Sequence, residues 1–124
     1  MPTVSVSIDV ADIKQAITFY SKALGCEISR NSPEISVLKA DNITIYLLEK
    51  AENTNPLPSG SASRTYDRHW TPIHLDFAIS DLERTLSLVK QFGGTYEGDD
   101  SGDWGSIAYC ADPFGNGFCL AKVN

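Results

Sequence analysis

The sequence has few of the residues that bind metals or cross-link a chain: two histidines, three cysteines and one methionine among 124 residues. Three cysteines cannot all pair with one another, so a complete disulfide framework is excluded. No Cys-x-x-Cys spacing is present, which argues against a structural zinc knuckle or a thioredoxin-like centre. We therefore expect Cys26, Cys110 and Cys119 to be reduced, partly buried thiols, as in a cytoplasmic protein.

Positive charge and long apolar runs are also scarce. The chain has 10 lysines and arginines against 16 acidic residues, which gives a net charge of −6. Without a basic stripe we expect no nucleic-acid partner, and an anionic membrane surface would repel the chain. No apolar run approaches the roughly 20 residues of a membrane span, and the first residues lack the pattern of a secretory signal. These absences predict a cytoplasmic protein with no membrane partner.

What is present is a pattern of one strand, one helix and three further strands. Residues 3–10 alternate between small polar and aliphatic side chains, as in a half-buried strand. Asp12 is a good N-cap for a helix, and Gly25 is a good terminator for it. Three short strands are expected after the helix, at 26–30, 34–40 and 43–49.

The same pattern recurs in the second half of the chain, where Asp81 stands in the place of Asp12 and Leu86 in the place of Ile17. The elements expected there are a strand at 73–79, a helix from Asp81 to Gly93, a strand near 95–97, a polar turn at 99–103, and strands at 104–111 and 116–122. Such a repeat predicts an α+β fold of two tandem βαβββ modules that form a cup-shaped incomplete barrel. We expect one domain over 1–124, with modules at about 1–50 and about 70–124.

The segment 51–69 is rich in proline, glycine, serine and asparagine, and it is expected to be a long loop between the modules. A loop of this length in a compact domain is either a functional lid or a linker, and the aromatic Tyr66 favours a lid. Arg64, Arg68 and His69 lie in or next to it. Their side chains either close on an anionic ligand or are solvated loop charges.

Several motifs together resemble those of a known superfamily. They are the segments 10–12, 19–20 and 24–25 in the first half, and 104–105, 112–116 and 118 in the second. In this order they resemble the two module signatures of the vicinal oxygen chelate superfamily, which includes glyoxalase I, bleomycin-resistance proteins, fosfomycin-resistance enzymes and extradiol dioxygenases. The run 68–77 is similar to one subgroup of small glyoxalase-like proteins. The resemblance covers nearly the whole chain and implies a cup built from paired βαβββ modules.

The resemblance also implies four metal-ligand positions, two per module, which fall here on Ser5, Tyr46, His74 and Cys119. A hard octahedral ion favours imidazole and carboxylate, and this set contains no carboxylate. We therefore expect no cofactor and no metal at the family position. A divalent ion remains possible at a rearranged site, where His74 and Cys119 hold zinc with Asp76 or His69 as a third ligand.

Polar side chains alternate on the first strand of each module, which suggests a wet cavity rather than a core face. His74 and Asp76 lie on one strand face as a candidate acid/base pair, or His74 is a structural histidine. The residues expected to bind a ligand are Ser5, Ser7, Asp9, Tyr46, His69, Trp70, Trp104 and Cys119.

Two functions follow from this candidate site. The first is a bleomycin-resistance-like protein that binds an aromatic or cationic small molecule, because the cavity is acidic and aromatic. The alternative is a glyoxalase-type lyase or isomerase that uses His74 and Asp76, with or without a metal ion. Whether the chain is an enzyme is left open at this point. The resemblance also implies a homodimer.

Overall fold

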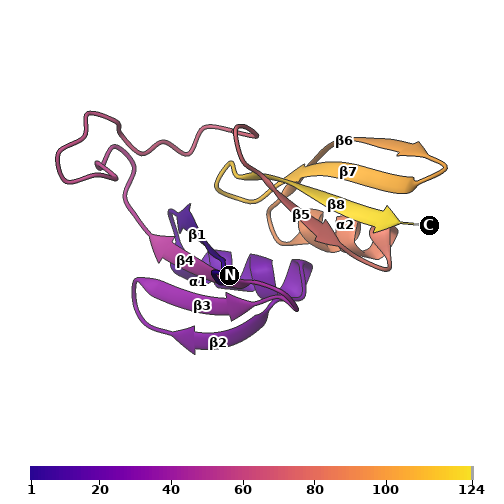
Figure 1. Cartoon of the computed structure of the whole chain (residues 1–124), viewed down its shortest axis with the longest axis horizontal. Coiled ribbons are helices and arrows are strands. Elements are labelled where there is room, and N and C mark those ends of the chain that lie inside the picture. The colour runs from indigo at the N-terminus through magenta and orange to yellow at the C-terminus, as the bar shows by residue number, and fades with distance from the viewer. Residues whose placement is uncertain (124) are drawn as a thin grey trace.

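The computed structural model describes residues 1–123 as two four-stranded sheets with helices packed against them (Figure 1). The strand orders are β1-β4-β3-β2 and β5-β8-β7-β6, which makes the second sheet a repeat of the first. The elements are β1 (Ser5–Val10), α1 (Ile13–Thr18), η1 (Phe19–Ala23), β2 (Glu27–Asn31), β3 (Ile35–Lys39), β4 (Thr44–Glu49), β5 (Leu75–Ala78), α2 (Leu82–Gln91), β6 (Thr95–Gly102), β7 (Gly105–Ala111) and β8 (Gly117–Val123). The expected α+β fold of two tandem βαβββ modules is confirmed.

The first helix begins and ends where its capping residues stand. The Asp12 carboxylate accepts a hydrogen bond of 3.1 Å from the backbone N–H of Gln15, which satisfies one free donor of the first turn. The helix continues as a π-helical turn, η1, and Gly25 then adopts the left-handed conformation, with φ of 75°. In the second module the Asp81 carboxylate caps α2 in the same way, through the N–H of Arg84 at 3.1 Å.

The one clear error in the expected elements is the polar turn at 99–103. The strand β6 continues through Gly102, with Asp100 paired to Ile107 and Ser101 to Ser106 of β7. β6 is an edge strand and its side chains here are exposed, so acidic and hydroxyl groups remain hydrated within the strand. The reversal of the chain is confined to Asp103 and Trp104, between β6 and β7.

The two modules share one hydrophobic core, although no strand ladder joins their sheets within residues 1–123. The rings of Phe19 and Phe118, from different modules, contact edge to face with centroids 6.0 Å apart. A Cβ on Gly94 would lie 2.7 Å from the Phe19 ring, so only glycine allows this close approach between α2 and η1. The modules are therefore packed together, and the sheets form no closed barrel.

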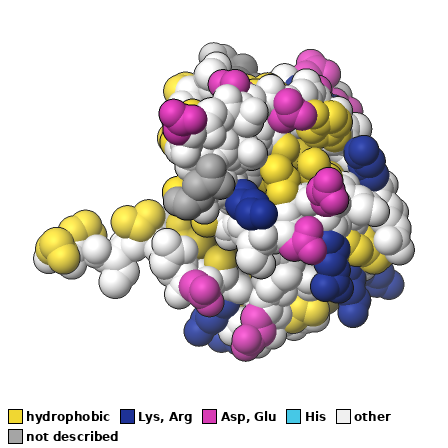
Figure 2. Space-filling view, turned by 90° about the vertical axis from the view of Figure 1, so that its right-hand side faces the viewer, with side chains coloured by type: hydrophobic (Ala, Val, Ile, Leu, Met, Phe, Trp, Pro, Cys, Tyr) yellow, Lys and Arg dark blue, Asp and Glu magenta, His cyan; other side chains and the backbone are white. Residues whose placement is uncertain are grey.

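In the first sheet one face packs on the core and the other is exposed at β3. On β3, Ser36 and Leu38 are fully buried, whereas Ile35 and Lys39 on the opposite face are exposed. In the view of Figure 2, acidic and basic side chains are interspersed over the surface, with apolar side chains between them. No helix among the described residues is long and apolar enough to cross a membrane.

Candidate functional site

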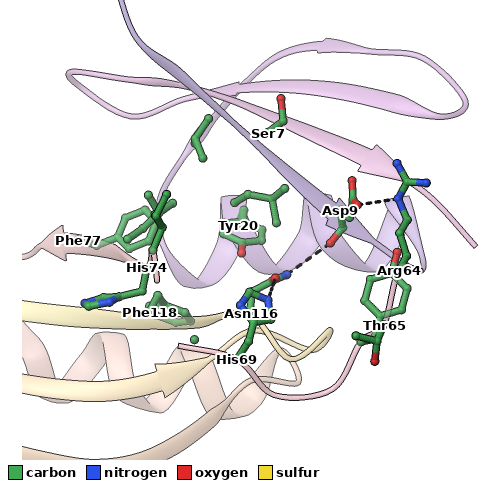
Figure 3. A pocket seen from close by; sticks show the side chains of 16 residues that line it. Ser7, Asp9, Tyr20, Arg64, Thr65, His69, His74, Phe77, Asn116 and Phe118 are labelled. Carbon is green, nitrogen blue, oxygen red and sulfur yellow. Dashed lines mark hydrogen bonds and ion pairs between the residues drawn. The ribbon is translucent and has the colours of Figure 1, made fainter. Parts of the chain in front are cut away.

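A cavity of about 440 Å³ lies between the two modules, and the connecting segment contributes to its lining (Figure 3). Ligand cavities of this kind typically measure about 300–1,000 Å³. The lining comes from β1, from residues 64–66 and 69 of the connecting segment, from β5 and the residues before it, and from the start of β8. Because both modules and the segment between them are needed to form it, neither module contains the cavity alone.

The deep part of the cavity is apolar. Its lining includes Val6 and Ile8 of β1 and the rings of Phe77 and Phe118, which contact each other edge to face with centroids 5.7 Å apart. Tyr20 also lines this part, but its hydroxyl is used elsewhere, because it donates a hydrogen bond of 2.7 Å to Asp112. A ligand would therefore meet mostly carbon surface in the deep part of the cavity.

The rim carries an ion pair between the modules' connecting segment and β1. The Arg64 guanidinium donates from Nε to Asp9 Oδ2 at 2.8 Å and from Nη1 to Thr54 Oγ1 and the Asn55 carbonyl, both at 3.2 Å (Figure 3). Its side chain is only 16% exposed. Arg64 thus holds the segment against the end of β1, and its charge is already used by Asp9 rather than free for an anion.

Arg68 and Tyr66 of the same segment also have partners within the chain. The Arg68 guanidinium pairs with Glu97 of β6, and the Tyr66 hydroxyl donates to the Lys50 carbonyl at 2.6 Å. Partial burial, followed by the negative charge of Asp9, raises the pKa of Tyr66, which keeps the phenol protonated. These contacts hold the segment 51–69 along one side of the cavity, which agrees better with the expected lid than with a free linker.

A second feature of the rim is a chain of hydrogen bonds from the core to His69. Asp112 is 2% exposed, and its carboxylate accepts from the Tyr20 hydroxyl, from the backbone N–H groups of Phe114 and Asn116, and from Asn116 Nδ2. Asn116 Oδ1 in turn lies 2.6 Å from His69 Nε2. The turn 112–116, which carries no predicted chemistry, therefore positions a histidine at the cavity.

A cluster of His74, Asp76 and Cys119 lies on the face of the second sheet opposite the buried Phe118 and Leu120, and its His74 also lines the cavity. Asp76 of β5 is the register partner of Cys119 in β8, so their side chains project from the same face, opposite the buried Leu120. His74 precedes β5, and its Nε2 lies 3.2 Å from Asp76 Oδ1. One donor atom from each of the three residues lies within 4.8 Å of the others.

Aromatic rings border this cluster. The Trp70 ring packs edge to face against His74, with centroids 5.6 Å apart, and against Tyr109, with centroids 5.9 Å apart. Burial, and secondly a hydrogen bond to Asp76, raise the pKa of the Cys119 thiol to about 12. In the protein without a bound ion, Cys119 is therefore a neutral thiol and not a nucleophilic thiolate.

The residues predicted from sequence fall into three groups. Ser7, Asp9, His69 and His74 line the cavity. Asp76 and Cys119 form the cluster with His74 next to the cavity, and Trp70 borders it. The remaining three lie elsewhere: Ser5 and Tyr46 are on the open face of the first sheet, and Trp104 is half-exposed at the turn between β6 and β7. Their role in ligand binding stays a prediction.

Sequence reasoning missed Asn116 and the two phenylalanines of the cavity. Phe77 and Phe118 lie in strands at positions that core residues also occupy, so no local signal separates a cavity wall from a core. For Asn116 a signal existed, because an acidic residue before Pro-Phe-Gly-Asn can accept several N–H groups of its own turn and orient the amide.

The four implied metal-ligand positions do not fit the hard divalent ion of metal-dependent superfamily members. They supply a hydroxyl (Ser5), a phenol (Tyr46), an imidazole (His74) and a thiol (Cys119), and no carboxylate. Only His74 and Cys119 belong to one close group, and the third member of that group is Asp76, which is not one of the four positions. We therefore derive no chemistry from an ion bound across the two modules.

Repeated βαβββ modules, paired around a cavity, define a protein of the vicinal oxygen chelate superfamily. The chain belongs to the glyoxalase-like family, because residues 5–121 match the Glyoxalase-like domain. Among curated proteins, none is similar enough in sequence to count as a match.

Solved structures agree on the fold. The fosfomycin resistance protein FosX from Listeria monocytogenes is 14% identical, with 99% of this chain and 91% of that chain covered and a TM-score of 0.75. A glyoxalase-related enzyme from Fulvimarina pelagi is 18% identical, with 98% and 88% covered and a TM-score of 0.73. Lactoylglutathione lyase from Agrobacterium tumefaciens is 16% identical, with 98% and 94% covered and a TM-score of 0.65.

Proposed function

We propose that this protein binds a small aromatic molecule, neutral or cationic, in the cavity between its modules. The observation that carries the proposal is the construction of the cavity: about 440 Å³ with an apolar interior and a few polar groups at its rim. Small-molecule sites typically combine these two features, apolar surface for affinity and few polar groups for orientation. The neighbours in fold, a fosfomycin resistance protein and a lactoylglutathione lyase, also act on small molecules by their names.

The charges around the cavity support a preference against anions. The chain has a net charge of −6, and Asp9 is the acidic group on the cavity lining. Asp9 is paired with Arg64, so a cationic ligand would take the place of the guanidinium at Asp9, and a neutral aromatic ligand would leave the pair intact. An anionic ligand would meet the field of Asp9 with no unpaired cation to offset it.

Tryptophan fluorescence tests this proposal. The Trp104→Phe variant leaves Trp70 as the single tryptophan, and Trp70 contacts His74, which lines the cavity. Titration with a cationic, a neutral and an anionic dye built on the same aromatic ring is expected to show quenching by the first two. Quenching by the anionic dye alone, or by none of the three, would contradict the proposal.

An Asp9→Asn substitution in the same background sharpens the test. It removes the carboxylate and leaves the Arg64 charge unpaired, so the affinity for the cationic dye should fall about tenfold and that for the anionic dye should rise. Glu83→Gln, on the exposed side of α2, makes the same charge change away from the cavity and should alter neither affinity. If both substitutions have equal effects, the preference arises from net charge and not from the cavity.

One observation favours a second candidate function, acid/base catalysis of the lyase or isomerase type. His74 Nε2 lies 3.2 Å from Asp76 Oδ1, an arrangement in which the carboxylate orients the imidazole. With the proton on Nε2, the lone pair on Nδ1 is left to accept a proton from carbon next to a carbonyl group. When lactoylglutathione is incubated with the wild-type protein in deuterated buffer, the α-hydrogen of lactoylglutathione should therefore exchange for deuterium.

Variants of the pair decide between a binding protein and an enzyme. His74→Gln and Asp76→Asn should each slow the exchange by about 100-fold or more, while Glu83→Gln leaves it unchanged. The proton is removed and a deuteron returned at the same carbon, so the exchange needs no second reactant. Absence of exchange in the wild-type protein with this compound and with other α-hydroxy carbonyl compounds would leave binding as the function.

A further inference from the structure

An imidazole, a carboxylate and a thiol lie together next to the cavity, on the face of the second sheet opposite the buried Phe118 and Leu120. His74 Nε2 lies 3.2 Å from Asp76 Oδ1, and the nearest donor atoms of His74, Asp76 and Cys119 all lie within 4.8 Å of one another. Asp76 and Cys119 are held side by side by the parallel ladder of β5 and β8. We propose that these three residues form a zinc site contained within one module, in place of a site shared between two modules.

The spacing is close to what zinc requires. Tetrahedral zinc has bonds of about 2.3 Å to sulfur and about 2.0–2.2 Å to nitrogen or oxygen, so its ligand atoms lie roughly 3.5 Å apart. The three donor atoms therefore need to approach one another by about 1.3 Å at most, from within 4.8 Å to roughly 3.5 Å. Cys119 is fixed in the sheet, whereas the side chains of His74 and Asp76 are 36% and 59% exposed and are free to make this adjustment.

The chemistry of the donor set favours zinc over a hard ion. A thiolate and an imidazole suit zinc, whereas magnesium and manganese favour carboxylate and carbonyl oxygen. When the ion binds, the Cys119 thiol proton passes to the solvent, and the thiolate and the Asp76 carboxylate together balance the two positive charges. Three protein ligands leave one position to solvent or to a ligand, which is the arrangement of reactive rather than purely structural zinc sites.

The proposal differs from the superfamily arrangement in two ways that can be tested separately. It requires Asp76, which does not occupy one of the four implied ligand positions, and it requires nothing from the first module. Ser5 and Tyr46, at the implied positions of the first module, lie in the other sheet. No hydrogen bond or ion pair among residues 1–123 connects Ser5 or Tyr46 to the cluster.

Cobalt replacement provides the test on untagged protein freed of metal by a chelator. Titration with Co²⁺ is expected to reach one ion per chain and to produce the near-ultraviolet charge-transfer band of a cobalt–thiolate bond. Competition with Zn²⁺ should remove the band, because zinc binds such sites more tightly than cobalt. No binding, or binding without the thiolate band, would overturn the proposal.

Four variants locate the site. Cys119→Ser should abolish the band, and Asp76→Asn, a change at an exposed side chain, should weaken Zn²⁺ binding by about 100-fold or more. Cys110→Ala, which removes a thiol from the core side of β7, should retain the band, as should the Ser5→Ala, Tyr46→Phe double variant. Circular dichroism confirms folding of each variant, and Asp76→Asn decides the matter if Cys119→Ser does not fold. If the double variant loses the thiolate band or Zn²⁺ affinity as strongly as Cys119→Ser or Asp76→Asn does, the site is shared between the modules and the proposal is refuted.

Discussion

His69 Nε2 and Asn116 Oδ1 lie 2.6 Å apart, and this contact connects the segment between the modules to the turn 112–116. Asn116 Nδ2 donates to the buried Asp112 carboxylate at 2.8 Å, which fixes the orientation of the amide. Oδ1 is then the only atom that can face His69, and because it is an acceptor, His69 Nε2 must carry a proton. In the neutral imidazole, Nδ1 is therefore the acceptor that His69 offers.

Replacement of Asn116 by alanine should test this chain of contacts. The substitution removes one donor from Asp112 and the partner of His69, so the free energy of unfolding should fall by about 1–3 kcal/mol. Urea denaturation measures the loss, and nitrogen NMR of the imidazole should show that the tautomers become mixed. Asn42→Ala, in the exposed turn between β3 and β4, is the control and should change stability by less than about 0.5 kcal/mol.

The buried contact between Tyr20 and Asp112 yields a second prediction. Burial, and secondly the Asp112 charge, raise the pKa of Tyr20 well above its ordinary value, so the phenol remains the donor at any moderate pH. Tyr20→Phe leaves the carboxylate short of one hydrogen bond at a site that water does not reach, and should cost about 1–3 kcal/mol in urea denaturation. Tyr96→Phe removes an exposed hydrogen bond to Asp99 and should have little effect. Equal losses of unfolding free energy in the two variants would show that the burial of Asp112 does not increase the cost of the missing hydrogen bond.

Much of the fold could be predicted because it depends on short-range signals. Asp12 and Asp81 cap the two helices as expected, and the recurrence of the whole pattern predicted the second module from the first. The turn expected at 99–103 was wrong because polar composition does not distinguish a turn from a hydrated edge strand. The helical spacing predicts one continuous helix up to Gly25 and did not anticipate the π-helical turn Phe19–Ala23, which contacts α2 of the other module.

The candidate site was predicted in part. Four of the residues predicted for it line the cavity, and they come from both modules and the segment between them: Ser7, Asp9, His69 and His74. Asp76 lies beside Cys119 through the ladder of β5 and β8, and the superfamily resemblance rather than alternation pointed to Cys119. The pairing of Arg64 with Asp9 joins residues far apart in the chain, and no spacing rule anticipates it. The homodimer, the cytoplasmic location and the absence of nucleic-acid and membrane partners stay predictions.

Loss of Arg64 should free the segment between the modules. Its guanidinium joins Asp9 to Thr54 and the Asn55 carbonyl, so Arg64→Ala removes the contacts that hold the segment against β1. We expect cleavage by chymotrypsin after Tyr66 to become about tenfold faster, because the cleavable conformation is populated more often. Arg84→Ala on the exposed surface of α2 is the control. Equal cleavage rates for wild type and Arg64→Ala would show that the ion pair does not restrain the segment.

The two core thiols should make the protein less stable at alkaline pH. Burial raises the pKa of Cys26 and of Cys110 from 9.0 to about 11. In the unfolded chain both thiols return to their ordinary pKa, so above about pH 9 the unfolded state releases protons that the folded state retains. The contribution to stability is complete below the ordinary pKa and is lost progressively as the pH rises toward about 11.

Urea denaturation with a chelator present tests this expectation. The urea midpoint of the wild-type protein should fall between about pH 8 and about pH 10. The midpoint of Cys110→Ala should fall less steeply, because this variant has one such thiol fewer. A midpoint that stays constant or rises over this range would show that the thiols ionise equally in both states.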